Sequence, residues 1–107
     1  MKLRAWPVLL AGVCFATSCI AADVAKGRAK AAACAACHGP QGLAVAPDAP
    51  NLAGQPEMYL AAQLKAYRDG TRKHEVMSLM AKPLSDADIE DLSAWFASLK
   101  VQLRSAP

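Results

Sequence analysis

The five residues "CAACH", from Cys34 to His38, constrain this chain more than any other part of its sequence. Two cysteines separated by two residues and followed directly by a histidine are compatible with four kinds of site: a structural disulfide, a thiol redox pair, a zinc site and a covalent attachment point for haem. The choice among them depends on the compartment in which the chain works and on the secondary structure around the cysteines.

Residues 1–22 have the pattern of a secretory signal peptide. Lys2 and Arg4 precede the mostly apolar run "AWPVLLAGVCFATSCIAA", which is too short and too interrupted to indicate a membrane span. Small residues, Ala21 and Ala22, stand directly before Asp23. We therefore expect cleavage after Ala22 and export to the periplasm.

Two alternatives to this cleavage stay open. Ile20 occupies the third position before the expected cut, where a small residue is usual, and an uncleaved segment would remain as an anchor. Lipid attachment at Cys19 is the other alternative, although Ala16 stands where a larger aliphatic residue would be expected. Cleavage after Ala22 predicts a mature domain of residues 23–107. Either alternative would leave additional residues before Asp23.

A mature chain of residues 23–107 is a single domain, near the size at which a hydrophobic core alone barely stabilises a fold. It keeps ten basic and nine acidic side chains of the 12 and nine in the full sequence, a net charge of +1. A nucleic-acid-binding domain would be far more basic, so we expect no nucleic-acid partner. Of the cysteines, only Cys34 and Cys37 remain, in an oxidising space where free thiols seldom persist.

The pattern of the mature chain is all-α. Asp23 is a plausible N-cap for a first helix over 24–37, and Pro56 and Gly70 are suited to begin and end a second helix. Ser85, followed by the acidic stretch "DADIED", predicts the start of a last helix. Core-facing spacing is expected for one set of its residues: Ile89, Leu92, Trp95, Phe96 and Leu99. Long loops separate the three helices, and no run alternates as a strand would.

This setting disfavours three of the four chemistries. Zinc needs four ligands, and the only other histidine, His74, lies far beyond the spacing of a zinc finger. A thioredoxin-like thiol pair belongs beside strands, which the pattern lacks. A disulfide between Cys34 and Cys37 would close a loop too small to restrict the unfolded chain much, and it leaves His38 unexplained.

Covalent haem attachment accounts for all five residues. The thiols of Cys34 and Cys37 would add to the two vinyl groups of one haem c, and His38 would become the proximal ligand of the iron. Ala35 and Ala36 between them carry no side chain that would obstruct the ring. The haem would also supply the large apolar core element that so small a domain lacks.

With these motifs the chain resembles a class I c-type cytochrome, and in particular one single-haem half of the bacterial cytochrome c4 family. The resemblance covers nearly all of the mature chain. It rests on Gly27, "CAACHG", "PNLAGQ", "YLAAQLKAYRDGTRK" and "MSLMAKPLSDADIEDLSAWFASLK". It implies a small fold of three main helices with long loops around one covalently attached haem.

The resemblance also implies roles for residues outside "CAACH". Gly27 would let the first helix cross closely over the aromatic pair Trp95 and Phe96 of the last helix, and a glycine within an alanine-rich helix otherwise costs stability. Pro50, in "PNL", would accept a hydrogen bond from the N–H of the ligand histidine through its backbone carbonyl. The alternative for Pro50 is an ordinary loop proline.

The sixth iron ligand decides between a carrier and an enzyme, because a thioether closes the iron to other ligands and favours electron transfer. Met77 matches the ligand position implied by the resemblance, with Met80 as the runner-up and His74 behind both. Met80 is otherwise a flexible wall of the haem pocket. Met58 lies in the first turn of a helix, where a core position is the simpler interpretation.

The sequence therefore predicts a periplasmic electron-transfer protein, not an enzyme, that carries one electron on a His38/Met77-ligated haem between redox proteins. The alternatives are a haem-bearing subunit of a dehydrogenase complex, and a haem enzyme or gas sensor with an open sixth position. Should haem be absent, a helical domain with a structural disulfide would remain. We expect membrane contact only through a membrane-bound partner, or through an uncleaved or lipidated N-terminus.

Overall fold

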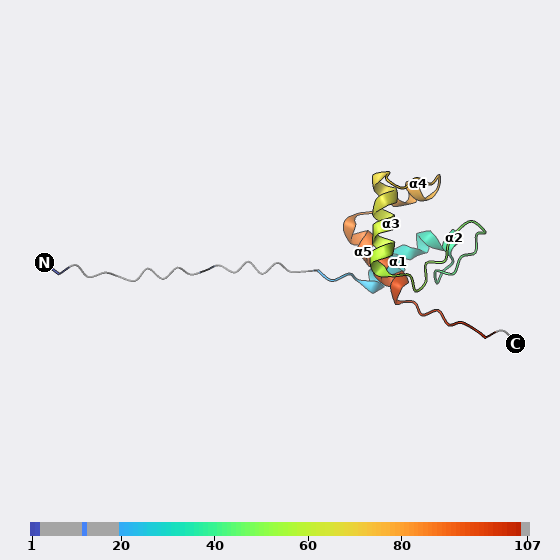
Figure 1. Cartoon of the computed structure of the whole chain (residues 1–107), viewed down its shortest axis with the longest axis horizontal. Coiled ribbons are helices and arrows are strands. Elements are labelled where there is room, and N and C mark those ends of the chain that lie inside the picture. Colours follow the sequence, from blue (N-terminus) through green and yellow to red (C-terminus); the bar gives the residue numbers. More distant parts are fainter. Residues whose placement is uncertain (3–11, 13–19, 106–107) are drawn as a thin grey trace.

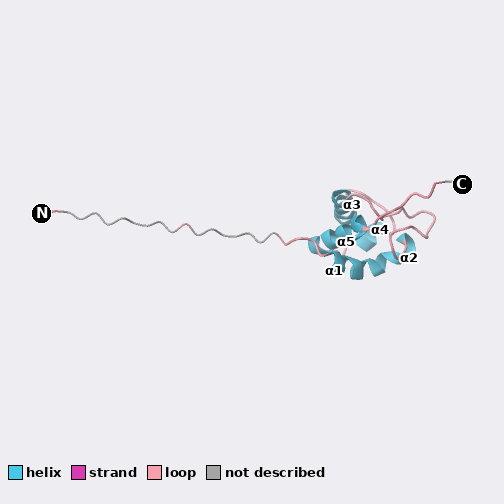
Figure 2. Ribbon diagram, turned by 90° about the horizontal axis from the view of Figure 1, so that it is seen from below, coloured by secondary structure: helices cyan, strands magenta, loops and turns pink. Residues whose placement is uncertain are grey.

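The computed structural model describes residues 1–2, 12 and 20–105, and this part of the chain is helical with no strand. The helices are α1 (Val24–Lys30), the 3₁₀ turn η1 (Ala31–Cys34), α2 (Ala35–His38), α3 (Glu57–Asp69), α4 (Met77–Ala81) and α5 (Asp86–Ser98). Figure 2 shows them as one cluster joined by loops. Most of the expected signal segment, Cys19 included, lies outside the described residues.

The expected first helix, over 24–37, is divided into three pieces. Asp23 caps α1 as expected, because its side chain accepts hydrogen bonds from the backbone N–H groups of Ala25 and Lys26. The chain then tightens into η1 before α2, and 3₁₀ turns of this kind are frequent at helix ends. The run ends at Gly39, whose φ of 77° is a conformation that glycine adopts at little cost.

Helices α3 and α5 lie close to the expected boundaries. Pro56 is the residue before α3 and not its first helical residue, and Gly70 ends the helix in the left-handed conformation with φ 82°. Ser85 caps α5 in a reciprocal capping box with Asp88, in which each side chain bonds the other residue's backbone N–H.

Helix α4 lies where the sequence predicts a loop, between the second and the last expected helices. Its first turn is held by the ring of His74, whose Nδ1 accepts hydrogen bonds from the backbone N–H groups of Val76 and Met77, at 3.2 Å each. These donors would otherwise lack partners at the start of a helix. A helix of five residues is also too short to show a hydrophobic period in the sequence.

Helix α1 crosses α5 at Gly27, and α3 packs against α5 (Figure 1). A Cβ atom on Gly27 would overlap the backbone carbonyl of Asp91 and lie 2.9 Å from Cβ of Trp95. Arg28, on the next position, places its guanidinium 5.6 Å from the centre of the Trp95 ring. The crossing of the first and last helices at a glycine is thus present in the structure.

The core gathers where these helices meet, and its buried members include Ala31, Leu60, Leu92 and Phe96. Ile89 is also fully buried, whereas Trp95 and Leu99 are only partly so. Among the described residues, no helix combines the length and the apolar character that a membrane crossing requires.

Candidate haem site

Cys34 and Cys37 lie within one turn of the helical run formed by η1 and α2. Cys34 is half-buried and Cys37 is exposed, and the two thiols are free, with no disulfide between them. Burial raises the pKa of the Cys34 thiol, because the thiolate is the form that loses most on leaving water. Because the two cysteines are three positions apart in this helical run, their side chains lie on the same side of it.

His38 follows directly and is buried, with 6% of its surface exposed. Its Nδ1 lies 2.8 Å from the backbone carbonyl oxygen of Pro50. A carbonyl oxygen can only accept, so Nδ1 carries the proton and donates it to Pro50. The lone pair of the neutral ring is then on Nε2, the nitrogen that this arrangement leaves for a metal.

The loop that carries Pro50 is fixed against the segment after His38. Asn51 accepts a hydrogen bond from the backbone N–H of Ala44 at 2.7 Å through its side-chain oxygen. The backbone carbonyl of Gly42 accepts from both Leu52 and Ala53, at 2.7 and 3.0 Å. Sequence reasoning missed the role of Asn51, although an asparagine beside a loop proline is a residue type that bonds backbone groups.

The methionines expected near the iron are both on α4. Met77 is half-buried at the first residue of this helix, and Met80 is 40% exposed. His74 is exposed, and its Nδ1 is engaged by the first turn of α4. Met58 is 86% exposed, so the interpretation of Met58 as a core residue is wrong.

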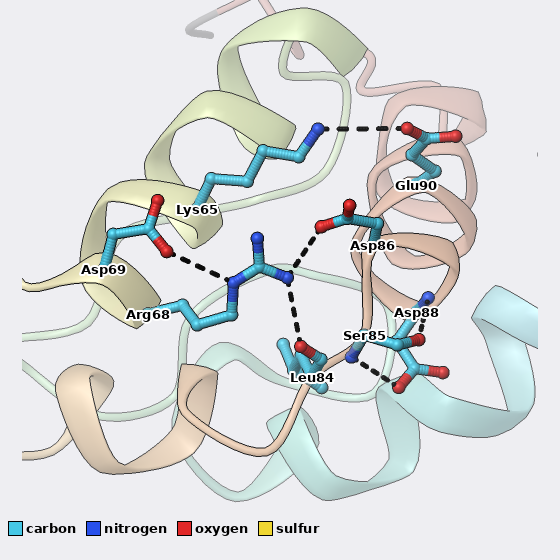
Figure 3. Close-up of polar contacts among 8 residues, drawn as sticks. All are labelled: Lys65, Arg68, Asp69, Leu84, Ser85, Asp86, Asp88 and Glu90. Atoms are coloured by element: carbon cyan, nitrogen blue, oxygen red, sulfur yellow. Dashed lines mark hydrogen bonds and ion pairs between the residues drawn. The ribbon is translucent and has the colours of Figure 1, made fainter.

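The segment after α4 is anchored to α3 by Arg68, another residue that sequence reasoning missed. Its guanidinium donates to the backbone carbonyl of Leu84 at 3.2 Å and pairs with Asp86 at 2.8 Å (Figure 3). The hydrogen bond from the Arg68 side chain is the main cause of the lowered pKa of Asp86. Arg68 thus holds the segment between α4 and α5, and Figure 1 shows α4 and α2 on the same side of α3.

Several large aliphatic side chains of these segments are exposed. On the loop after α2, Leu43 is 50% and Val45 is 66% exposed, and on α4 Leu79 is 71% exposed. Val76 and Met80 add to this apolar surface. Exposed apolar surface next to two free thiols and an oriented imidazole fits a large apolar ring with an iron at its centre. The donor set and the surroundings therefore fit a covalent haem.

A protein-family model described as "Cytochrome c" matches residues 24–100 of this chain. The chain belongs to the cytochrome c family. Members of this family carry haem c covalently, and Cys34 and Cys37 fit the attachment motif. The resemblance expected from the sequence and the all-α class I cytochrome fold are confirmed.

Individual relatives support the same membership. This cytochrome is 46% identical over 86 residues to cytochrome c4 of Pseudomonas aeruginosa, covering 80% of this chain and 43% of the relative. It is 48% identical over 81 residues to cytochrome c-554(548) of Halomonas halodenitrificans, covering 73% of this chain and 98% of that protein. Over 79 residues it is 48% identical to a "Thiosulfate dehydrogenase electron acceptor" of Thiomonas intermedia, covering 73% and 36%.

The solved structure of reduced recombinant cytochrome c4 from Pseudomonas stutzeri is similar, with a TM-score of 0.70 and 44% identity over 75% of this chain and 47% of that one. The chain thus spans about half the length of the cytochrome c4 relatives that it matches. These relatives are cytochrome electron carriers and not enzymes, which supports a haem c electron-transfer role for this cytochrome.

Proposed function

We propose that this cytochrome works in the periplasm and carries one electron between redox proteins on a haem c attached to Cys34 and Cys37, with His38 and Met77 as iron ligands. One observation supports the proposal above the others. His38, directly after the two thiols, is buried and commits Nδ1 to the Pro50 carbonyl at 2.8 Å. An imidazole with a fixed tautomer and a free Nε2 is the form in which histidine binds a metal.

When bound, haem c supplies a one-electron change at its iron. The residues of this chain supply position and surroundings. The two thiols would hold the ring beside α2, and the Pro50 carbonyl makes the His38 imidazole a stronger iron ligand by accepting a hydrogen bond from Nδ1. The aliphatic side chains of the loop after α2 and of α4 would cover the ring and keep water from it.

Met77 is favoured over Met80 by how α4 is held. The backbone N–H of Met77 is bonded to the ring of His74, so the position of its residue is fixed at the start of the helix. Met77 is also the less exposed of the two, since Met80 is 40% exposed. A thioether ligand opposite His38 would close the iron to exogenous ligands, as an electron carrier requires.

The name of one relative suggests which class of protein donates electrons to this cytochrome. A protein that is 48% identical over 79 residues is named as a thiosulfate dehydrogenase electron acceptor. We therefore propose that an exported dehydrogenase is one redox partner of this chain, either as a separate enzyme or with the cytochrome as its haem subunit. A haem enzyme or gas sensor is less favoured, because it needs an open sixth position.

Visible absorption spectra of the holoprotein, exported together with the haem-attachment machinery, test the proposal. We expect a low-spin spectrum and, in the ferric state, the weak far-red band of a thioether bond to iron. Met77→Ala should abolish this band, and Met80→Ala, the matched control on the same helix, should retain it. The reverse result would assign Met80 as the ligand. A high-spin wild-type spectrum that shifts readily with carbon monoxide would replace the carrier by an enzyme or sensor.

A further inference from the structure

The backbone nitrogen of Asp23 donates a hydrogen bond to the Oδ1 atom of Asp91 at 2.6 Å, between residues 68 positions apart. Asp23 is the N-cap of α1, and Asp91 lies in α5. In the full chain this nitrogen belongs to the peptide bond between Ala22 and Asp23. That bond is also the one at which a signal segment ending in two alanines would be cut.

Hydrolysis of this bond changes the chemistry of the contact. Water adds across the Ala22–Asp23 bond, so the carbonyl carbon of Ala22 becomes a carboxyl group that leaves with the leader, and the nitrogen of Asp23 becomes an α-amino group. An α-amino group has a pKa of about 7.7–8.0 in unfolded peptides and carries a proton at neutral pH. A neutral N–H donor would thereby be replaced by an ammonium group facing a carboxylate.

We propose that cleavage after Ala22 creates an N-terminal ammonium group on Asp23 that pairs with Asp91, so that removal of the leader completes the contact between α1 and α5. The hydrogen bond to the Asp91 carboxylate would then gain a coulombic attraction between two charged groups. The nitrogen and the carboxylate oxygen are already 2.6 Å apart, so the new charge would meet Asp91 without any rearrangement of α1 or α5.

The position of the cut matters because a positive charge is unfavourable at a helix N-terminus. The ammonium group of Asp23 would meet two compensating carboxylates, that of Asp91 and its own, which accepts from the N–H groups of Ala25 and Lys26. Lys26 pairs with the Asp23 side chain at 3.8 Å, and Glu57 lines the same surface hollow as Ala22. In a chain that begins at Ala22, the charged α-amino group would lie up to about 3.8 Å from the nitrogen of Asp23. The group that faces Asp91 would then still be the neutral backbone N–H of Asp23.

Asp91 would then hold α1 in two ways. Its backbone carbonyl lies against Gly27, and its side chain holds the residue that begins the helix. The helical run that begins with α1 continues through η1 to Cys34 and His38. The pair of Asp23 and Asp91 would therefore fix the beginning of this run, and the haem would be attached near its other end. The inference does not depend on which methionine binds the iron.

Intact-mass measurement of the exported holoprotein is the first test. We expect the mass of residues 23–107 plus one haem. A chain that begins at any other residue, or one acylated at Cys19, would overturn the proposal.

The second test is a double-mutant cycle on thermal stability in the holoprotein. One chain begins at Asp23, and the other retains Ala22 behind a different export signal, each with and without Asp91→Asn. The asparagine keeps an oxygen that can accept the N–H but removes the charge. We expect Asp91→Asn to lower the Tm of the Asp23 chain by roughly 4–8 °C more than that of the Ala22 chain. Equal losses in both chains would overturn the ion pair.

Glu90→Gln is the matched control for this cycle. Glu90 is the neighbour of Asp91 on α5, and its carboxylate pairs with Lys65 at 3.8 Å, away from the N-terminus. Its neutralisation should change the Tm of the two chains by the same amount. Equal effects here, together with unequal effects of Asp91→Asn, assign the coupling to the pair formed by Asp91 and the new N-terminus.

Discussion

The carbonyl oxygen of Pro50 lies 2.8 Å from Nδ1 of His38 and accepts a hydrogen bond from that nitrogen. The contact uses the backbone of Pro50, so no substitution of its side chain removes it directly. Its geometry depends instead on the neighbouring residue, because Asn51 bonds the backbone N–H of Ala44 at 2.7 Å and fixes this loop against the segment after His38.

We therefore predict that Asn51→Ala loosens the His38–Pro50 hydrogen bond. The free energy of unfolding should fall by about 1 kcal/mol, as for the loss of one hydrogen bond. The reduction potential of the holoprotein should rise, because a less polarised imidazole stabilises the ferric iron less. Voltammetry and denaturant unfolding measure the two effects.

Gln55→Ala is the control for this variant, since the Gln55 side chain donates only a long 3.4 Å bond to the Asn51 carbonyl in the same loop. It should leave the potential unchanged. A potential that stays at the wild-type value in Asn51→Ala, despite the lost stability, would show that the loop keeps Pro50 in place without this bond.

The parts of this protein that the sequence predicts are those specified by residues close together in the chain. Helix α5 is an example, because Ser85 and Asp88 make its cap within a single turn. Cys34, Cys37 and His38 form a contiguous motif, so one helical run brings them together whatever the rest of the fold does.

The parts that were missed depend on contacts that no short pattern contains. The segment that follows α4 is an example, because it is anchored by Arg68 of α3, 16 positions away from Leu84 in the chain. The preference for Met77 over Met80 stays a prediction that rests on the family resemblance, because two methionines three positions apart lie on one side of a helix and differ only in what surrounds them.

The crossing at Gly27 leads to a second prediction. Helix propensity alone predicts that Gly27→Ala gains about 1 kcal/mol. The added Cβ would overlap the Asp91 carbonyl and lie 2.9 Å from Cβ of Trp95, so α1 and α5 must separate. We expect the free energy of unfolding to fall by at least about 2 kcal/mol.

Ala29→Gly is the reciprocal control, because it makes the opposite exchange at an exposed position of the same helix. It should cost about 1 kcal/mol, the propensity difference alone. Thermal or denaturant unfolding of both holoproteins provides the comparison. A stabilised Gly27→Ala variant would contradict the close crossing.

The ion pair between Arg68 and Asp86 predicts a pH dependence of stability. Arg68 lowers the pKa of Asp86 in the folded protein (Figure 3). Such a carboxylate stabilises the fold above the pKa of the unfolded chain, about 3.9, and this contribution is lost as the pH falls through the lower folded value. Between neutral pH and pH values below about 4, the wild type should therefore lose more stability than Asp86→Asn does.

Denaturant unfolding across this pH range measures the difference between the two proteins. Because Asp86 is exposed, 1 M salt should reduce the difference at neutral pH. Parallel pH profiles for wild type and Asp86→Asn would contradict a role for this pair in the stability of the segment between α4 and α5.

The last prediction concerns Ser93, which is fully buried in α5 and whose hydroxyl has no hydrogen-bond partner within the described part of the chain. A buried hydroxyl without a partner costs about 1–3 kcal/mol relative to its hydration in the unfolded chain. Ser93→Ala removes that oxygen at a small loss of volume, so we expect the free energy of unfolding of the holoprotein to rise by about 1 kcal/mol. The matched control is Ser98→Ala, which deletes an exposed hydroxyl bonded to the Trp95 carbonyl at 2.6 Å and should cost up to about 1 kcal/mol. If Ser93→Ala is instead destabilised, the Ser93 hydroxyl has a hydrogen-bond partner in the holoprotein, and the expectation is wrong.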